Sequence, residues 1–176
     1  ALDRGRAVGP YESTLRRLVH LFKYDRRHTL TTTLGTLIRQ HGADLLADAD
    51  CVVPVPLHPR RRRARGFNQA AELAAHLGPP VVHALRRTVA TPPQTGLPAA
   101  QRHGNVRGVF APARTQQRWR GRGARGGALQ GACVVLVDDV ATTGATLEAC
   151  ARVLRGCGVG EVRALTLARV VHRESH

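Results

Sequence analysis

Two stretches near the beginning of the chain have apolar residues at helical spacing. In residues 11–23, Leu15, Leu18, Val19 and Phe22 recur every three or four positions, and a second periodic stretch covers residues 30–46. Apolar residues at this spacing line one face of an α-helix. The pattern therefore predicts that two helices open the chain.

The next part of the chain predicts a strand, a loop and a helix. Residues 51–56 form a short apolar run that is stopped by prolines, which is typical of a buried strand ending in a rigid loop. The arginine-rich residues 57–66 predict a basic loop. Residues 67–78 then predict a helix in which Asn68 is the N-cap.

The alternation continues to the end of the chain. Residues 80–85 predict a second strand, and the β-branched run 133–137 predicts a fully buried one. A helix over 144–156 and a closing strand over 162–171 follow. Strands that alternate with helices predict an α/β fold with a twisted parallel sheet flanked by helices.

The composition fits this fold class and one domain over residues 1–176. The chain has 176 residues, 3% aromatics and no Met, so the core consists mainly of Leu, Val and Ala. No segment has the roughly 20 apolar residues of a membrane span, and residues 1–10 carry charges where a signal peptide is apolar. We therefore expect a cytoplasmic protein without membrane insertion.

Two segments are expected to be loosely held. Residues 88–105 are rich in proline and polar residues and predict a flexible loop. Residues 111–131 are basic and low in complexity, and they predict a disordered insertion.

The four cysteines are Cys51, Cys133, Cys150 and Cys157, and no two of them form a CxxC pair. Each lies in or next to an apolar stretch, which favours buried free thiols. We therefore expect no zinc in this chain.

The charge is strongly basic and unevenly placed. The formal net charge is +15, and no Asp or Glu occurs from Leu73 to Val137. Such a charge distribution attracts polyanions, which include nucleic acids and polyphosphorylated small molecules.

The chemistry that stands out is at the end of the run 133–137. Asp138 and Asp139 follow it, and the small residues 141–146 then lead into a helix. Carboxylates can hold a sugar diol, or a divalent ion through water, and a helix N-terminus preceded by small residues can bind a phosphate. The acid pair alone is typical of a solvated turn, and the small residues alone are typical of a capped helix. Together, behind a buried strand, they favour a site for a ribose 5-phosphate.

The stretch VVLVDDVATTGAT, residues 134–146, resembles the phosphoribosyl pyrophosphate motif of type I phosphoribosyltransferases. Residues 53–74 and 91–110, together with 11–27, are similar to the competence-associated ComF family of phosphoribosyltransferase-like proteins. The resemblance implies a type I phosphoribosyltransferase-like fold in which residues 10–45 form a small N-terminal hood. It spans nearly the whole chain apart from 111–131.

The resemblance also implies roles for residues. Asp138 and Asp139 would hold the ribose hydroxyls and, through water, Mg²⁺. The pyrophosphate would bind after the first strand, and the Val55–Pro56 bond could be cis there. The residues implied for the pyrophosphate are Pro56, Leu57, His58 and Arg60, and those implied for the 5-phosphate are Ala141, Thr142, Thr143, Gly144, Ala145 and Thr146.

The flexible loop would close over the reacting centre, with Gln94 and Arg102 as its candidate residues. Two features depart from the family pattern. Many ComF relatives carry a zinc-binding cysteine cluster near the amino end, and this chain has none. Thr142 stands where relatives that use 6-oxopurines place an aspartate base, which argues against such a substrate.

The resemblance leaves two functions open. The first is the binding of phosphoribosyl pyrophosphate with Mg²⁺, with transfer of phosphoribose to a nitrogen nucleophile and a role in DNA uptake. The second is a non-catalytic module that binds single-stranded DNA or competence proteins. The residues proposed for DNA are Arg118, Trp119, Arg120 and Arg122, where arginines flank one aromatic ring. A homodimer is kept open, and a transcriptional regulator is disfavoured because no helix-turn-helix pattern is apparent.

Overall fold

The computed structural model describes residues 1–24, 28–88, 108–113 and 129–171. Twelve labelled elements follow one another in the order strand, three helices, strand, two helices, three strands, helix, strand. They are β1 (Arg4–Pro10), α1 (Ser13–Tyr24), α2 (His28–His41), α3 (Ala43–Leu46), β2 (Cys51–Pro54), α4 (Pro59–Arg65), α5 (Gln69–Ala74), β3 (Leu85–Arg87), β4 (Phe110–Pro112), β5 (Cys133–Ala141), α7 (Ala145–Gly156) and β6 (Glu161–Arg169).

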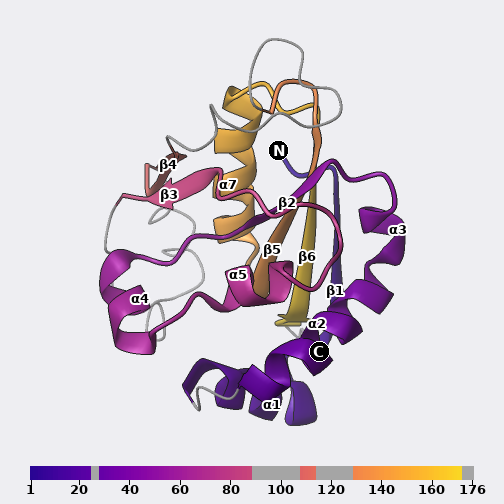
Figure 1. Ribbon diagram of the computed structural model, residues 1–176, viewed down its shortest axis with the longest axis vertical. Helices are drawn as coiled ribbons and strands as arrows, with labels where there is room; N and C mark the ends of the chain where they lie inside the picture. The colour runs from indigo at the N-terminus through magenta and orange to yellow at the C-terminus, as the bar shows by residue number, and fades with distance from the viewer. Residues whose placement is uncertain (25–27, 89–107, 114–128, 172–176) are drawn as a thin grey trace, which may run out of the picture.

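A four-stranded sheet with the order β1-β6-β5-β2 forms the centre of the molecule. All of its neighbouring strands pair in parallel, with Val52 opposite Val135 and Val135 opposite Arg163. Figure 1 shows α7 along one side of this sheet and α2 and α3 along the other. The predicted α/β class, a parallel sheet flanked by helices, is confirmed.

Two apolar layers hold the helices to the sheet. On one face, Val134 and Leu136 of β5 pack with Leu147, Cys150 and Leu154 of α7. Because successive strand residues point to opposite faces, Val135 and Val137 lie in the second layer. That layer also contains Val19, Phe22, Leu34, Ile38 and Leu73 from α1, α2 and α5. The helix predicted over 144–156 is therefore present as α7, and it buries the face that carries Leu147, Cys150 and Leu154.

The prediction that two helices open the chain is wrong, because the edge strand β1 precedes them. Arg4 and Arg6 of this strand both bind Asp44, and the strand pairs with β6 from Arg4 opposite Arg163 to Pro10 opposite Arg169. Charged side chains are common on an edge strand, where one side faces water. Its charges and glycines hide the strand pattern in the sequence.

The predicted helix over 30–46 is divided at Gly42 into α2 and α3. A Cβ atom at this position would overlap the side chain of Leu165 in β6. The helix layer therefore approaches the sheet closely only because residue 42 is a glycine.

The basic segment 57–66, predicted as a loop, contains the helix α4. Pro59 stands in the first turn, where its fixed φ suits a helix, and His58 accepts the N–H of Arg60 as N-cap. Gly66 ends the helix with φ +82°, and its N–H donates to the carbonyl of Arg62 at 2.8 Å. The two caps offset the repulsion among the like charges of α4.

The strand predicted over 80–85 is reduced to one bridge between Val81 and Val52. The chain instead forms β3, which pairs antiparallel with β4 in a separate two-stranded sheet. Most of the predicted loop over 88–105 and of the predicted insertion over 111–131 lies outside the described residues.

Residues 10–45, the predicted hood, comprise α1, α2 and the beginning of α3. Figure 1 shows α1 lying across the end of the sheet at which β6 terminates. Their role as a hood over a substrate stays a prediction. Among the described helices, none is both long and apolar enough to cross a membrane.

Candidate functional site

The two acids of the motif lie in β5, beyond the last residue that pairs with β2. Pairing between these strands ends at Pro54 opposite Val137, and Val55 N–H makes one further bond to the carbonyl of Val137 at 2.9 Å. On the other side β5 stays paired with β6 as far as Ala141. The acids were expected after the end of the strand, and this is corrected: one edge of β5 remains in the sheet while β2 turns away from the other.

The departure of β2 leaves a cavity of about 160 Å³ beside the acids, which we call the acid cavity. It contains both members of the predicted acid pair and the beginning of the predicted pyrophosphate loop. The residues that line it are Val55, Pro56, Leu57, Arg61, Asn68, Gln69, Ala70, Arg87, Asp138, Asp139 and Thr146. The loop after β2, α4, the beginning of α5, β3, β5 and α7 therefore all contribute residues to one space.

The loop after β2 is fastened by Asn68. Its Nδ2 donates to the carbonyl of Val55 at 3.1 Å, and its Oδ1 accepts the N–H of Ala70 at 3.2 Å as the N-cap of α5. The cap was predicted, but the bond to Val55 was not. The Val55–Pro56 bond is trans, since no cis peptide occurs among the described residues. The cis form, which the resemblance left possible for this bond, is therefore not the one adopted.

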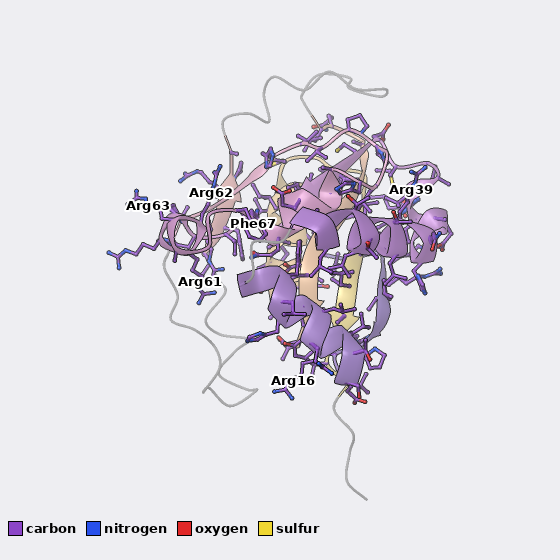
Figure 2. All side chains as sticks on the ribbon, turned by 60° about the horizontal axis from the view of Figure 1, so that its bottom comes forward. Arg16, Arg39, Arg61, Arg62, Arg63 and Phe67 are labelled. Atoms are coloured by element: carbon purple, nitrogen blue, oxygen red, sulfur yellow. The ribbon has the colours of Figure 1, made fainter. Side chains whose placement is uncertain are left out.

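Pro56 and Leu57 line the acid cavity, whereas His58 and Arg60 do not. His58 caps α4, and its partial burial together with the nearby cations, Arg87 first, lowers its pKa. A neutral ring is what its Nδ1 needs in order to accept the N–H of Arg60. Of the α4 arginines it is Arg61 that reaches the cavity. Figure 2 shows Arg61, Arg62 and Arg63 leaving α4 in different directions.

Arg87, at the end of β3, is the cavity residue that sequence reasoning missed. Its guanidinium carbon lies 5.5 Å from the ring centroid of Phe110. Burial, followed by repulsion from Arg61, lowers its pKa, while the Asp138 carboxylate acts in the opposite direction. Two cations and two carboxylates thus share a partly buried space. The signal in the sequence was an arginine pair directly after the apolar run 80–85.

The predicted phosphate loop turns from β5 into α7. Gly144, with φ +76°, is the N-cap of α7, and Thr143 Oγ1 accepts the N–H of Ala145 at 3.4 Å. Thr146 lines the acid cavity, and the backbone N–H groups of the first helical turn are those that lack a partner within a helix. The loop therefore ends beside the acids.

Other loop residues face a different space. Ala141, Thr143 and Gly144 line a cavity of about 340 Å³ on the side of β1 and β6. Thr142 is exposed and Ala145 is buried. The loop thus borders two cavities.

The remaining predicted site residues, Gln94, Arg102, Arg118, Trp119, Arg120 and Arg122, lie outside the described residues. All four cysteines are free, and Cys51 and Cys150 are buried. Within the described ranges no cluster of three or more His, Cys, Asp or Glu side chains could hold a metal. The acid pair is therefore the carboxylate group of this cavity, with Asp139 N–H donating to Asp138 Oδ1 at 2.9 Å.

Several known proteins are similar to this chain. Residues 63–176 match the family model of the phosphoribosyl transferase domain. The chain is 31% identical over 180 residues to competence protein F of Haemophilus influenzae, and the alignment covers 95% of this chain and 73% of that protein. It is 31% identical over 177 residues to the DNA utilization protein YhgH of Escherichia coli K12, with 93% and 71% covered. Orotate phosphoribosyltransferase from Aeropyrum pernix shares 21% identity and a TM-score of 0.44, over 90% of this chain and 78% of that one.

Proposed function

Since this chain belongs to the phosphoribosyl transferase domain family and is a ComF-like member of it, we propose that its acid cavity binds phosphoribosyl pyrophosphate together with Mg²⁺. The family and the type I phosphoribosyltransferase-like fold predicted from the sequence are confirmed. The observation that carries the proposal is the meeting of Asp138 and Asp139 with Pro56, Leu57 and two arginines around one cavity.

The acids suit the ribose. Two adjacent carboxylates offer several acceptor positions, enough for the two hydroxyls of a vicinal diol. Arg87 lies close enough to Asp138 for their charges to interact, so this acid stands beside a cation in the cavity. Asp138 and Asp139 therefore hold the sugar, and the loop from Ala141 to Thr146 receives its 5-phosphate at the beginning of α7.

The donor set also fits magnesium in one particular way. Mg²⁺ keeps several waters and is usually bound through one or two carboxylates together with substrate phosphates. Two aspartates without a third acidic or histidine neighbour among the described residues match that mode better than a dedicated metal cage. Bound Mg²⁺ would neutralise the pyrophosphate leaving group.

Two arginines of the cavity suit the pyrophosphate group of the ligand. Arg61 and Arg87 line the same cavity as Pro56 and Leu57, the residues proposed for the pyrophosphate. Guanidinium groups form paired bonds to phosphate oxygens, and these bonds are stronger where water is partly excluded. We propose that the two side chains bind the pyrophosphate and stabilise the charge that develops as its bond to C1 of the ribose breaks. The phosphoribosyl group would pass to a nitrogen nucleophile.

The biological role is proposed from the relatives. Their names, competence protein F and DNA utilization protein, refer to the uptake and use of DNA. We propose that this chain acts in DNA uptake and that its ligand site serves that process.

Calorimetry tests the ligand site directly. Asp138→Ala with Asp139→Ala should abolish the binding of phosphoribosyl pyrophosphate in Mg²⁺, and a chelator should weaken binding to the native protein at least tenfold. Asp44→Asn is the matched control, because Asp44 is an acid that does not line the acid cavity and whose partners are Arg4 and Arg6. Unchanged affinity in the double variant, with the control behaving like the native protein, would refute the proposal.

A second function, single-stranded DNA binding without catalysis, is favoured by the exposed arginines of the helical layer, among them Arg16 and Arg39 in Figure 2. Binding through phosphates weakens steeply as salt rises. Arg118→Ser with Arg120→Ser and Arg122→Ser should then reduce the mobility shift of a single-stranded oligonucleotide. An unaltered shift would remove that segment from the DNA-binding surface.

A further inference from the structure

A larger cavity lies next to the acid cavity. It has a volume of about 610 Å³, is bounded by α4, α5 and β3, and is called here the arginine cleft. Pro56, Leu57, Asn68 and Arg87 line both cavities, so the two share a wall. The volume falls within the roughly 300–1,000 Å³ that is usual for small-molecule sites. Neither the acids nor the phosphate loop belongs to this cleft.

The cleft carries net positive charge. Arg62 from α4 and Arg86 and Arg87 from β3 line it, against one carboxylate, that of Glu72 in α5. Arg62 is exposed, and none of the described residues hydrogen-bonds or ion-pairs with its side chain. Because guanidinium forks match phosphate oxygens in pairs, three of them around one concave surface select an anion that carries phosphate.

The remaining wall is mostly apolar, with Asn68 and His83 as its polar members, and it contains the phenyl ring of Phe67. Phe67 lines the cleft together with Leu85, Pro54 and Pro59. The Phe67 ring meets Phe22 edge-on, with the centroids 5.8 Å apart, so the core holds it in place. Figure 2 shows Phe67 on the same side of the molecule as Arg62. A fixed aromatic ring beside cations is the combination on which bases stack while their phosphates are neutralised.

From this combination we propose that the arginine cleft binds a nucleotide. Arg62 and Arg86 bind its phosphates, the base packs on the wall that contains Phe67, and Glu72 accepts a hydrogen bond from the sugar or from an amino group of the base. A free nucleotide and the terminal nucleotide of a DNA strand present the same chemistry to these residues. The binding of a nucleotide in this cleft goes beyond the proposed function and does not depend on it, whereas its relation to the transfer reaction rests on that function.

The position of the cleft determines what its ligand can do. A nucleophile that displaces pyrophosphate must approach C1 of the ribose from the side opposite the leaving group. The cleft adjoins Pro56 and Leu57, on the proposed pyrophosphate side. Its ligand is therefore not the acceptor of phosphoribose but a separate molecule, held beside the site and able to influence it through the shared Arg87.

Titration calorimetry with ADP near physiological salt tests the proposal. Arg62→Ser and Arg86→Ser should each weaken ADP binding at least fivefold. Arg63→Ser is the control and should weaken ADP binding less than twofold. This substitution removes the same charge from the next position of the same helix, but Arg63 does not line the cleft. Equal losses in Arg62→Ser and Arg63→Ser would overturn the proposal in favour of general electrostatic attraction. Thermal melting confirms that each variant folds.

Two further arms locate the nucleotide and identify it. Asp138→Asn with Asp139→Asn should not reduce ADP affinity, and a tenfold loss would place ADP in the acid cavity and overturn the proposal. Ribose 5-phosphate should bind at least fivefold more weakly than ADP, and equal binding would overturn recognition of the base. The last probe is a 5′-phosphorylated single-stranded oligonucleotide. If it binds more tightly than ADP and Arg62→Ser weakens its binding, the natural ligand is the end of a DNA strand. If it binds more weakly than ADP, the natural ligand is a free nucleotide.

Discussion

The side-chain amide of Asn68 donates a hydrogen bond to the carbonyl oxygen of Val55 at 3.1 Å, while its oxygen caps α5. One residue thus fixes the loop after β2 and begins the helix that packs against the sheet. Because the two bonds use different atoms of the same side chain, substitutions can separate them.

Asn68→Ser and Asn68→Ala are expected to differ in stability but not in ligand affinity. Serine is a good N-cap and alanine is not, so the alanine variant should be less stable by about 1 kcal/mol. Both lose the bond to Val55, and both should bind phosphoribosyl pyrophosphate several-fold more weakly. Urea unfolding and calorimetry measure the two effects. Native affinity in the serine variant would show that the bond to Val55 does not position the loop.

Gly144→Ala should impair ligand binding as well as stability. At φ +76° a Cβ meets no atom within 4 Å, so the cost is backbone strain of about 1–2 kcal/mol, part of which a change in loop conformation relieves. Gly131→Ala is the matched control, with φ +71° and open space, in the turn that precedes β5. Both variants should lose similar stability in urea, and only Gly144→Ala should lose affinity for the sugar pyrophosphate. Equal affinities would remove the loop from the site.

Arg87→Gln should lower the affinity for phosphoribosyl pyrophosphate at least tenfold, about 1.4 kcal/mol at 25 °C. The reason is that Arg87 is a half-buried cation beside Asp138, where an added anion is screened less than at the surface. Arg63→Gln removes an exposed charge and should change affinity less than twofold. Calorimetry on the two variants gives the comparison. Similar losses of affinity would mean that the ligand responds only to the net charge of the protein and not to the position of Arg87.

Stability should decrease in acid through the ion pair of Arg163 and Asp48. Arg163 is buried in β6, and its hydrogen bonds to Asp48 lower the pKa of that carboxyl from 3.8 to about 2. In the unfolded chain this carboxyl takes up a proton as the pH falls below about 4, whereas in the folded chain it does so only near pH 2. The ion pair therefore contributes its full stability above about pH 4, and this contribution is lost as the pH falls from about 4 to about 2. Asp48→Asn should lack this part of the acid response in urea titrations at pH 5 to 2. Identical pH profiles would contradict the assignment.

Thiol labelling should follow burial. Burial raises the pKa of Cys51 to about 12 and that of Cys133 to about 11, and it raises the pKa of Cys150 further. Since the thiolate is the reactive form, iodoacetamide at pH 8 should modify the partly exposed Cys157 first and leave Cys51 and Cys150 unmodified. Peptide mass spectrometry follows the order, and all four should react in urea. Early modification of Cys150 would show that α7 opens readily.

The parts of the fold that the sequence predicted are those set by local patterns. The apolar run 133–137 and the spacing of Leu147, Cys150 and Leu154 identify β5 and α7, because burial on one or both faces leaves a periodic trace. Helix α4 had local signals too, Pro59 and Gly66, but its arginine run was interpreted as a loop. β1 left no such trace, because an edge strand needs few apolar residues and is held by Asp44 and β6.

The candidate site divides in the same way. The acid pair and the small residues before α7 were recognisable because they are adjacent in sequence and their chemistry is local. Tertiary structure decided which basic residues share the cavity with those acids. Arg61 and Arg87 do, whereas Arg60 and His58 do not. β2 leaves the sheet before β5 ends, α4 turns one arginine inward, and the β3–β4 pair places another across from Asp138. These positions depend on how separate segments pack together, which no single stretch of the sequence encodes.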